Sequence, residues 1–285
     1  MYKNIYTNFD TLYGELVKYI INNGTYIQEK VRTTYSDGKP AYYIQAHNIN
    51  FEYETQKNTK NEILAPILTT RYAPYKSAIK EMYWIYILAN NNIDYLNNIL
   101  KVKFWNEWKL KDGTLGKGYG YQINKKTYNY NTQLEYVIGE LKNNPNSRRI
   151  ITELWNVDDL PEMSLTPCCR STQWTVENGK LNLKVFQRSC DVALGLVSNF
   201  IQFYVLLCLV SEEVGLETGN LAWDITNAHI YDRHLDDIQK QIERSTFAPP
   251  VLEIPKFKSI FDININEIKL NNYNYREKIA YEIAI

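Results

Sequence analysis

Apolar side chains recur at helical intervals in three stretches of the chain. Residues 10–23 form the first stretch and precede Gly24, which predicts a helix that ends at this glycine. Residues 76–90 are strongly apolar and predict a second helix. Residues 199–214 are apolar on nearly every side, so we expect a central core helix that ends at Gly215. The apolar face of the first stretch consists of Leu12, Leu16, Tyr19 and Ile20.

Strands are predicted between these helices. Residues 41–53 and the buried run at 150–155 each predict one strand. Residues 173–189 hold two β-rich runs around Asn178-Gly179, a dipeptide that suits a tight hairpin turn. Helices and strands mix without a strand–helix–strand repeat or a Gly-rich phosphate motif, which indicates the α+β class. No repeat or low-complexity linker divides the chain, so we expect one domain over residues 1–285.

The composition narrows the possible classes of protein. Lysine plus arginine and aspartate plus glutamate number 32 each, so no overall field favours nucleic acid or an anionic membrane. The N-terminus lacks an apolar stretch of signal-peptide length, and residues 203–210, the most apolar run, are too short to cross a bilayer. Four cysteines without metal-type spacing indicate reduced thiols in a cytoplasm, and we expect no metal site.

Two of these cysteines, Cys168 and Cys169, stand side by side in the segment LTPCC. Adjacent side chains on an extended segment point to opposite faces, so at most one of them can face a given pocket. The residues alone leave open which of the two does so.

Four groups of segments occur in one order along the chain. They are KEMYW followed by FWNEW, then LTPCC, then QRSCDVALG followed by Asn199, and finally AHIY. In this order and spacing they resemble the thymidylate synthase family, whose enzymes methylate dUMP with a reduced folate. ILTT, NPNSRR, GKGYG and the C-terminal isoleucine extend the resemblance over nearly the whole chain. It implies a single domain with a mixed β-sheet packed by helices, and a homodimer formed across the sheet.

The resemblance implies a nucleophile and a phosphate site. The family's nucleophile follows the proline of an L-x-P-C motif directly, which selects Cys168, whereas Cys169 stands where many members have histidine. Nearby positive charge lowers the pKa of a thiol, and guanidinium groups match phosphate oxygens well. Two adjacent arginines are implied to reach across from the partner subunit. The implied phosphate ligands are Arg32, Arg148, Arg149, Arg188 and Ser189.

Further residues are implied to contact the nucleoside. The amide of Asn199 can both donate and accept, which suits O4 and N3–H of uracil, whereas an aspartate here would suit cytosine, as in related dCMP hydroxymethylases. His229 and Tyr231 match the pair that binds the ribose 3′-hydroxyl. Glu81 is costly in an apolar helix unless it is bonded or functional. The resemblance implies that it moves protons around the uracil ring together with Tyr119.

The implied co-substrate is 5,10-methylenetetrahydrofolate. Its pterin is expected to bind a carboxylate, its rings to lie against apolar side chains, and the C-terminal carboxylate to help close a lid. These implied folate contacts are Asp191, Trp105, Trp108, Leu194 and Ile285. In the implied reaction, Cys168 adds to C6 of dUMP and makes C5 nucleophilic. The folate supplies a methylene group and then a hydride, giving dTMP and dihydrofolate.

Several departures from the family pattern leave alternatives open. GLVSN replaces the common G-x-P-F-N, Asn227 and Asn106 replace common aspartates, and Arg71 replaces a common lysine. A dUMP hydroxymethylase would share the early steps and then admit water instead of hydride. A non-catalytic nucleotide- or RNA-binding relative is a further alternative. A cysteine hydrolase built on Cys168 and His229 would leave the arginines unexplained.

Overall fold

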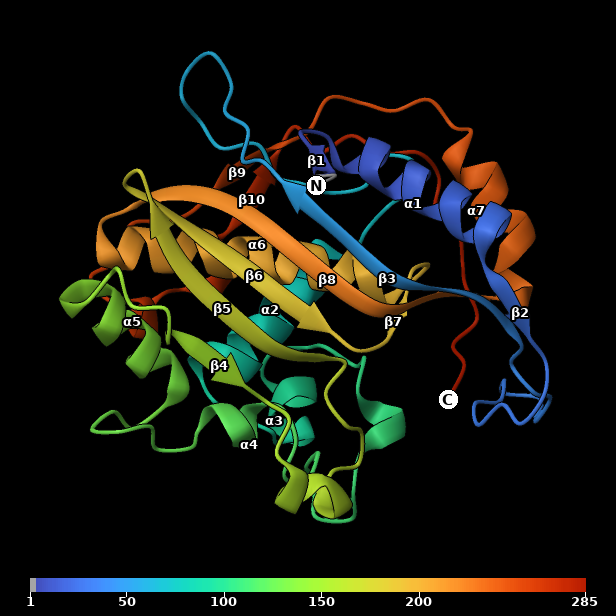
Figure 1. Cartoon of the computed structure of the whole chain (residues 1–285), viewed down its shortest axis with the longest axis horizontal. Coiled ribbons are helices and arrows are strands. Elements are labelled where there is room, and N and C mark those ends of the chain that lie inside the picture. The colour runs from blue at the N-terminus through green and yellow to red at the C-terminus, as the bar shows by residue number, and fades with distance from the viewer. Residues whose placement is uncertain (1–3) are drawn as a thin grey trace.

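The computed structural model describes residues 4–285 and contains an eight-stranded mixed sheet packed by helices (Figure 1). The sheet order is β1 (Ile5–Tyr6), β3 (Tyr43–Tyr53), β8 (Glu217–Tyr231), β6 (Lys180–Gln187), β5 (Cys169–Glu177) and β4 (Ile151–Glu153), with β2 (Thr25–Ile27) on β3 and β7 (Cys190–Asp191) on β8. Three strand pairs are parallel, namely β1 with β3, β6 with β8 and β7 with β8. The other pairs of this sheet are antiparallel. The expected α+β class is confirmed.

Helix α6 (Gly195–Val214) lies behind the sheet and forms the centre of the core (Figure 1). Phe200 of this helix stacks on Trp223 of β8, with ring centroids 5.2 Å apart, and on Phe9 of the first helix at 4.4 Å. The other helices are α1 (Phe9–Asn23), α2 (Tyr75–Met82), α3 (Ile93–Asn98), α4 (Gly120–Ile123), α5 (Gln133–Asn143) and α7 (Leu235–Ile242).

Short helical turns and a second sheet complete the chain. β9 (Val251–Glu253) and β10 (Lys269–Asn271) pair antiparallel. A π-helical segment, Tyr83–Ile87, continues α2. The 3-10 turns are Asn106–Trp108, Val157–Glu162, Asp232–His234, Ile260–Asp262 and Ile265–Glu267.

The opposite face of the sheet is not covered by a helix of the described chain (Figure 1). A row of half-buried side chains crosses four neighbouring strands on this face. Lys184 in this row also forms an ion pair with Asp224, with 2.9 Å between nitrogen and oxygen. The row consists of Glu52, Ala222, Lys184 and Gln173.

The predicted first helix is confirmed, but one residue of its apolar face was assigned wrongly. Tyr19 is 50% exposed, because it lies at the border of the face that packs on the core. Gly24 ends the helix with extended backbone, at φ −76°. Only glycine fits at this position, since a Cβ atom there would lie 2.4 Å from the carbonyl oxygen of Ile20.

The other two helices differ from their predicted bounds. The second is α-helical only to Met82 and becomes π-helical afterwards, a change that often marks a functional site. The third begins at Gly195, four residues earlier than predicted, and ends at Gly215 in the left-handed region at φ +72°. By length and composition it is apolar enough to cross a membrane, yet 78% of its most apolar stretch is buried within the fold.

The predicted strands are largely confirmed. The hairpin of β5 and β6 turns at Asn178 and Gly179, whose φ angles are +51° and +77°. The run 150–155 is strand only over Ile151–Glu153. The expectation that it is buried is confirmed for alternate residues only: Ile150, Thr152 and Leu154 are buried, whereas Ile151 on the other face of this edge strand is 39% exposed.

Candidate active site

Cys168 and Cys169 differ in their access to solvent. Cys168 lies immediately before β5 and is half-buried, whereas Cys169 is the first residue of the strand and is buried. The two other cysteines of the described chain, Cys190 and Cys208, are also buried free thiols. Cys168 is therefore the most accessible of the four.

The guanidinium of Arg188 holds the turn that leads into Cys168. Its Nε donates to the Pro167 carbonyl oxygen at 2.9 Å, and Nη2 donates to the Thr166 carbonyl oxygen at 2.8 Å. The same Nη2 lies 3.7 Å from Sγ of Cys168. A cation thus stands beside the sulfur at a fixed position, as the sequence analysis expected.

Tyr119 contacts the same residue from the glycine-rich segment. Its hydroxyl oxygen accepts the backbone N–H of Cys168 at 3.3 Å. Its backbone lies at φ +50° and ψ −108°, a conformation that favours glycine. Such strain costs about 1–3 kcal/mol and persists where the surroundings impose it, often at functional sites. The adjacent Gly120 is required, since a Cβ atom there would lie 1.9 Å from the Asn90 carbonyl oxygen.

The groups around Cys168 shift the pKa of its thiol in opposite directions. Burial raises the pKa of its thiol above the ordinary value, and the carboxylate of Asp191 adds to this rise. Arg188, Tyr119 and Arg32 lower the same pKa but do not outweigh burial. The arginines beside Cys168 therefore reduce, but do not cancel, the rise in its pKa that burial causes.

Glu81 is a buried carboxylate with two hydrogen-bond donors. It is 7% exposed on α2, which excludes a surface position. Nε1 of Trp105 donates to Oε1 at 2.7 Å, and Nε2 of Gln202 donates to Oε2 at 2.8 Å. Burial raises the pKa of Glu81 to about 7, although both hydrogen bonds act in the opposite direction. A carboxyl group with this pKa can both release and accept a proton near neutral pH.

Asn199 lies inside α6, one turn after its start. The helix was expected to begin at Asn199, where this residue could serve as its N-cap, but α6 begins at Gly195 and Asn199 does not cap it. Nδ2 of Asn199 donates to Oε1 of Gln202 at 3.0 Å. Gln202 was not among the predicted site residues, although a glutamine within an almost wholly apolar helix, three residues after Asn199, was a usable signal.

His229 and Tyr231 lie together at the end of β8. Nδ1 of His229 is 3.0 Å from Oδ1 of Asn227, whose Nδ2 donates to Gln45. Because this amide nitrogen is engaged, its oxygen faces the ring, so Nδ1 carries the proton and Nε2 is an acceptor. Burial lowers the pKa of His229, which keeps the ring neutral. Asn227, which stands where the family commonly has aspartate, thus helps to orient the ring of His229.

The expected folate residues surround the same region. Oδ1 of Asp191 accepts the backbone N–H groups of Ala193 and Leu194, at 2.9 and 3.3 Å, just before α6. Trp105 makes edge contacts with Trp108 and Tyr119, at centroid distances of 5.7 and 4.6 Å. Asp191 also pairs with His229 between β7 and β8. The structure therefore places the carboxylate of Asp191 beside His229 in the sheet, and the aromatic wall beside Tyr119.

A family model described as thymidylate synthase matches residues 11–285. The chain belongs to the thymidylate synthase family. Thymidylate synthase of Fusobacterium nucleatum subsp. nucleatum is 50% identical over 277 residues, which cover 97% of this chain and 98% of that protein. Thymidylate synthase 1 of Bacillus subtilis strain 168 is 41% identical, covering 98% and 100%. The solved structure of thermostable thymidylate synthase A from Bacillus subtilis superposes with a TM-score of 0.90 at 40% identity, again covering 98% and 100%.

In this thymidylate synthase family member, the last residues lie against the loop that holds Arg32. Ile285 exchanges two backbone hydrogen bonds with Thr34, at 2.8 and 2.9 Å. Tyr281 is buried and donates from its hydroxyl to Gln241 at 2.7 Å, which anchors the segment. The positive charge of Arg32 lowers the pKa of the Cys168 thiol. The structure thus brings Ile285 to the side of the site where Arg32 stands.

The departures from the family pattern occupy different positions. Arg71 is buried, and Nε donates to Oε1 of Gln241 at 3.1 Å while the guanidinium lies 5.3 Å from the ring of Tyr281. Its charge is therefore turned into the fold rather than toward a ligand in solvent. Asn106 is exposed and accepts from Asn97 at 2.7 Å. Residues 196–198 lie in the first turn of α6.

The paired arginines stand apart from the other predicted phosphate residues. Arg148 and Arg149 are exposed and precede the edge strand β4. Their carbonyl oxygens accept from Gln173 and Tyr136, at 3.2 and 2.7 Å, which fixes their backbone. Ser189 is half-buried and directly follows Arg188. Of the predicted phosphate residues, Arg188 and Arg32 are the two whose charges lower the pKa of the Cys168 thiol.

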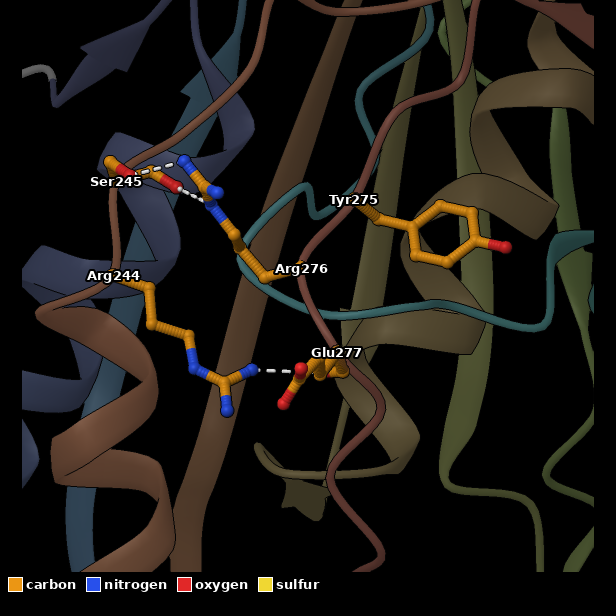
Figure 2. Close-up of a pocket in the computed structure, with 5 residues that line it drawn as sticks. All are labelled: Arg244, Ser245, Tyr275, Arg276 and Glu277. Carbon is orange, nitrogen blue, oxygen red and sulfur yellow. Dashed lines mark hydrogen bonds between the residues drawn. The ribbon is translucent and has the colours of Figure 1, made fainter.

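A surface cleft of about 380 Å³ lies elsewhere, between α7 and the C-terminal segment (Figure 2). Arg244 donates to the Glu277 carbonyl oxygen at 2.8 Å, and Arg276 donates to the Ser245 carbonyl oxygen at 3.0 Å. Figure 2 shows the Tyr275 ring directed away from both guanidinium groups. These arginines join two segments of backbone.

Over residues 4–285, no cluster of three or more histidine, cysteine, aspartate or glutamate side chains is arranged to hold a metal ion.

Proposed function

We propose that the chain converts dUMP to dTMP, with 5,10-methylenetetrahydrofolate as donor of the one-carbon unit and hydride and with dihydrofolate as second product. The observation that carries this proposal is the placement of Cys168 against Arg188 beside the bonded series Trp105, Glu81, Gln202 and Asn199. A cysteine hydrolase would have no use for such a series. Family membership favours the synthase over a dUMP hydroxymethylase.

We expect the purified chain, given dUMP and 5,10-methylenetetrahydrofolate, to form dTMP and dihydrofolate in equal amounts. Equality is required because the folate that donates the methylene group is itself oxidised when it returns the hydride. Mass spectrometry of the nucleotide and the absorbance of dihydrofolate measure the two products. Formation of 5-hydroxymethyl-dUMP without dihydrofolate would overturn the synthase assignment in favour of the hydroxymethylase.

The proposed chemistry begins at Cys168. Its Sγ forms a bond to C6 of the uracil ring, and the electron pair of the C5–C6 double bond moves toward C5 and O4. Arg188, whose Nη2 is 3.7 Å from Sγ, stabilises the thiolate that reacts. An N–H of Asn199 stabilises the developing charge on O4. Once the one-carbon unit is bonded to C5, the C5 proton and the folate nitrogen leave, and hydride from the folate reduces the exocyclic methylene carbon that results. The electron pair that returns to the C5–C6 bond then expels Sγ from C6 and frees dTMP.

Glu81 is proposed as the group that moves protons around the ring, with Tyr119. Its pKa of about 7 suits both directions of transfer at neutral pH. Tyr119 fixes the backbone of Cys168 through its hydroxyl, which places the phenol beside the reacting sulfur. His229, protonated on Nδ1, offers Nε2 to the ribose 3′-hydroxyl. The ring of Tyr231 makes an edge contact with the His229 ring, with 5.1 Å between the two ring centroids.

The folate is proposed to lie over the nucleotide, between the aromatic wall and the tail. Asp191 binds the donors of the pterin, and Trp105 and Trp108 supply flat apolar surface. Leu194 and Ile285 are proposed to complete the enclosure, which excludes water from the reacting carbon. The folate supplies the one-carbon unit and the hydride, and these side chains orient it. Four free thiols in the described chain support our further proposal of a cytoplasmic location.

We also propose a homodimer that forms across the uncovered face of the sheet. Half-buried side chains cross this face in a row, and another protein surface would bury them. Arg148 and Arg149 stand exposed beside the edge strand, apart from Arg188 of their own chain. In the proposed dimer they complete the phosphate site of the partner, together with its Arg32, Arg188 and Ser189. Guanidinium groups from two chains would then meet one phosphate.

Replacement of Asn199 by aspartate tests whether this residue recognises the base of the nucleotide. We expect Asn199→Asp to weaken use of dUMP and to improve use of dCMP, because a carboxyl group changes the donor and acceptor pattern. Loss of two hydrogen bonds in the buried site costs roughly 2–5 kcal/mol. The ratio of kcat/KM for dUMP and dCMP measures the effect. An equal response of both substrates would mean that Asn199 does not read the base.

A further inference from the structure

Gln202 is the link between the residue proposed to read the base and the residue proposed to move protons. It is 5% exposed and lies one turn after Asn199 on the same face of α6. Its Nε2 donates to Oε2 of Glu81 at 2.8 Å, and its Oε1 accepts from Nδ2 of Asn199 at 3.0 Å. Both ends of its amide are therefore engaged.

The direction of these two hydrogen bonds follows from Glu81. When Glu81 is ionised its carboxylate can only accept, and the end of the Gln202 amide that faces it is then the nitrogen, which is the orientation that the structure has. The other end, which faces Asn199, must then be the oxygen. An oxygen there selects the nitrogen of the Asn199 amide as its neighbour. The Asn199 amide is thereby held in one of its two orientations.

This orientation matters because an asparagine amide alone does not distinguish the two pyrimidines. Uracil presents the acceptor O4 beside the donor N3–H, whereas cytosine presents an amino donor beside the acceptor N3. One orientation of the Asn199 amide complements uracil, and the same amide turned by 180° complements cytosine. Turning it would place Oδ1 against Oε1 of Gln202, where neither atom can donate. A group beyond the base must therefore fix the orientation.

We propose that Gln202 is a positioning residue that fixes the amide of Asn199 and so selects uracil over cytosine. The proposal rests on the proposed role of Asn199 as the group that contacts the base. Gln202 itself touches neither the substrate nor the folate and acts through its two bonded neighbours. It is anchored in turn by Glu81, which Trp105 holds from the other side at 2.7 Å.

Two variants separate this role from simple packing. Gln202→Met keeps the length of the side chain but can hold neither neighbour, so we expect the dUMP to dCMP ratio of kcat/KM to fall by about tenfold, the size of one good hydrogen bond. Gln202→Glu keeps an oxygen for Asn199 when it shares a proton with Glu81. It should retain the preference for dUMP and move the pH profile of kcat.

Ser211→Ala is the matched control, because Ser211 is buried on the same helix, and no protein group in the described chain bonds its hydroxyl. It should leave the ratio and the pH profile unchanged. Equal loss of dUMP and dCMP turnover in Gln202→Met would overturn the proposal. So would a Gln202→Glu enzyme with an unmoved pH profile, a result that stands even if the methionine variant fails to fold.

Asn199→Asp distinguishes this inference from the function on which it rests. If that variant changes the dUMP to dCMP ratio and Gln202→Met does not, Gln202 takes no part in base selection. A wild-type chain that binds dUMP and dCMP equally in calorimetry overturns the inference as well. A wild-type chain that binds dUMP selectively but forms no dTMP overturns the proposed function, and the ratio of dUMP to dCMP binding in Gln202→Met then decides the inference by itself.

Discussion

Cys168→Ser is expected to lower the turnover of dUMP by on the order of 10⁴-fold or more, because a neutral hydroxyl is a far poorer nucleophile than a thiolate. The substitution changes one atom, and Arg188 keeps its hydrogen bonds to the Pro167 and Thr166 carbonyl oxygens. Binding of dUMP should therefore persist. Formation of dihydrofolate measures turnover, and calorimetry measures binding.

Cys169→Ser provides the control for this variant. Cys169 is buried at the start of β5, so its replacement should lower stability slightly and leave most of the activity. Thermal unfolding of both variants shows whether each is folded. Loss of activity in Cys169→Ser with activity retained in Cys168→Ser would mean that the neighbouring thiol is the nucleophile.

The second large effect concerns the proposed dimer. Subunits that carry Arg148→Ala and Arg149→Ala should be nearly inactive, because the partner's phosphate site loses two cations. Mixed with Cys168→Ser subunits, they should regain activity. Half of the dimers in an equal mixture are mixed, and each has one intact site of two, so recovery should reach about a quarter of the wild-type activity.

Subunit exchange must be verified independently, for example by labelling one variant and isolating mixed dimers by its tag. Activity that stays near zero in isolated mixed dimers would show that the arginines act within their own chain. A double variant with full activity by itself would show that they do not bind the phosphate.

Local signals in the sequence were sufficient to predict several structural elements. The Asn178-Gly179 turn and the stop at Gly215 were predictable because each depends on backbone that only a few residues adopt readily. The start of α6 was not predictable in this way. Its first turn follows backbone amides held by Asp191, which belongs to β7, and strand pairing places that residue there.

The chemistry of the site was predicted in part. Composition and spacing alone left Cys168 and Cys169 equivalent, and only the resemblance chose between them. The strained backbone of Tyr119 carried no signal, because its conformation depends on tertiary packing that the local sequence does not reveal, such as the close approach of Gly120 to Asn90. The raised pKa of the Cys168 thiol was also not expected. Burial depends on the whole fold, and here it outweighs the arginines that the sequence had placed nearby.

Helix α6 divides into two parts with different consequences for genetic variation. Its first two turns carry Asn199 and Gln202, whereas Leu206, Leu209 and Val210 in later turns are fully buried and touch only the core. A core leucine reduced to alanine costs about 2–5 kcal/mol, a large share of the stability of a domain. Alleles altered at these three later residues should therefore be temperature-sensitive, while alleles altered at Asn199, which is only partly buried, should accumulate normal amounts of inactive protein at every temperature.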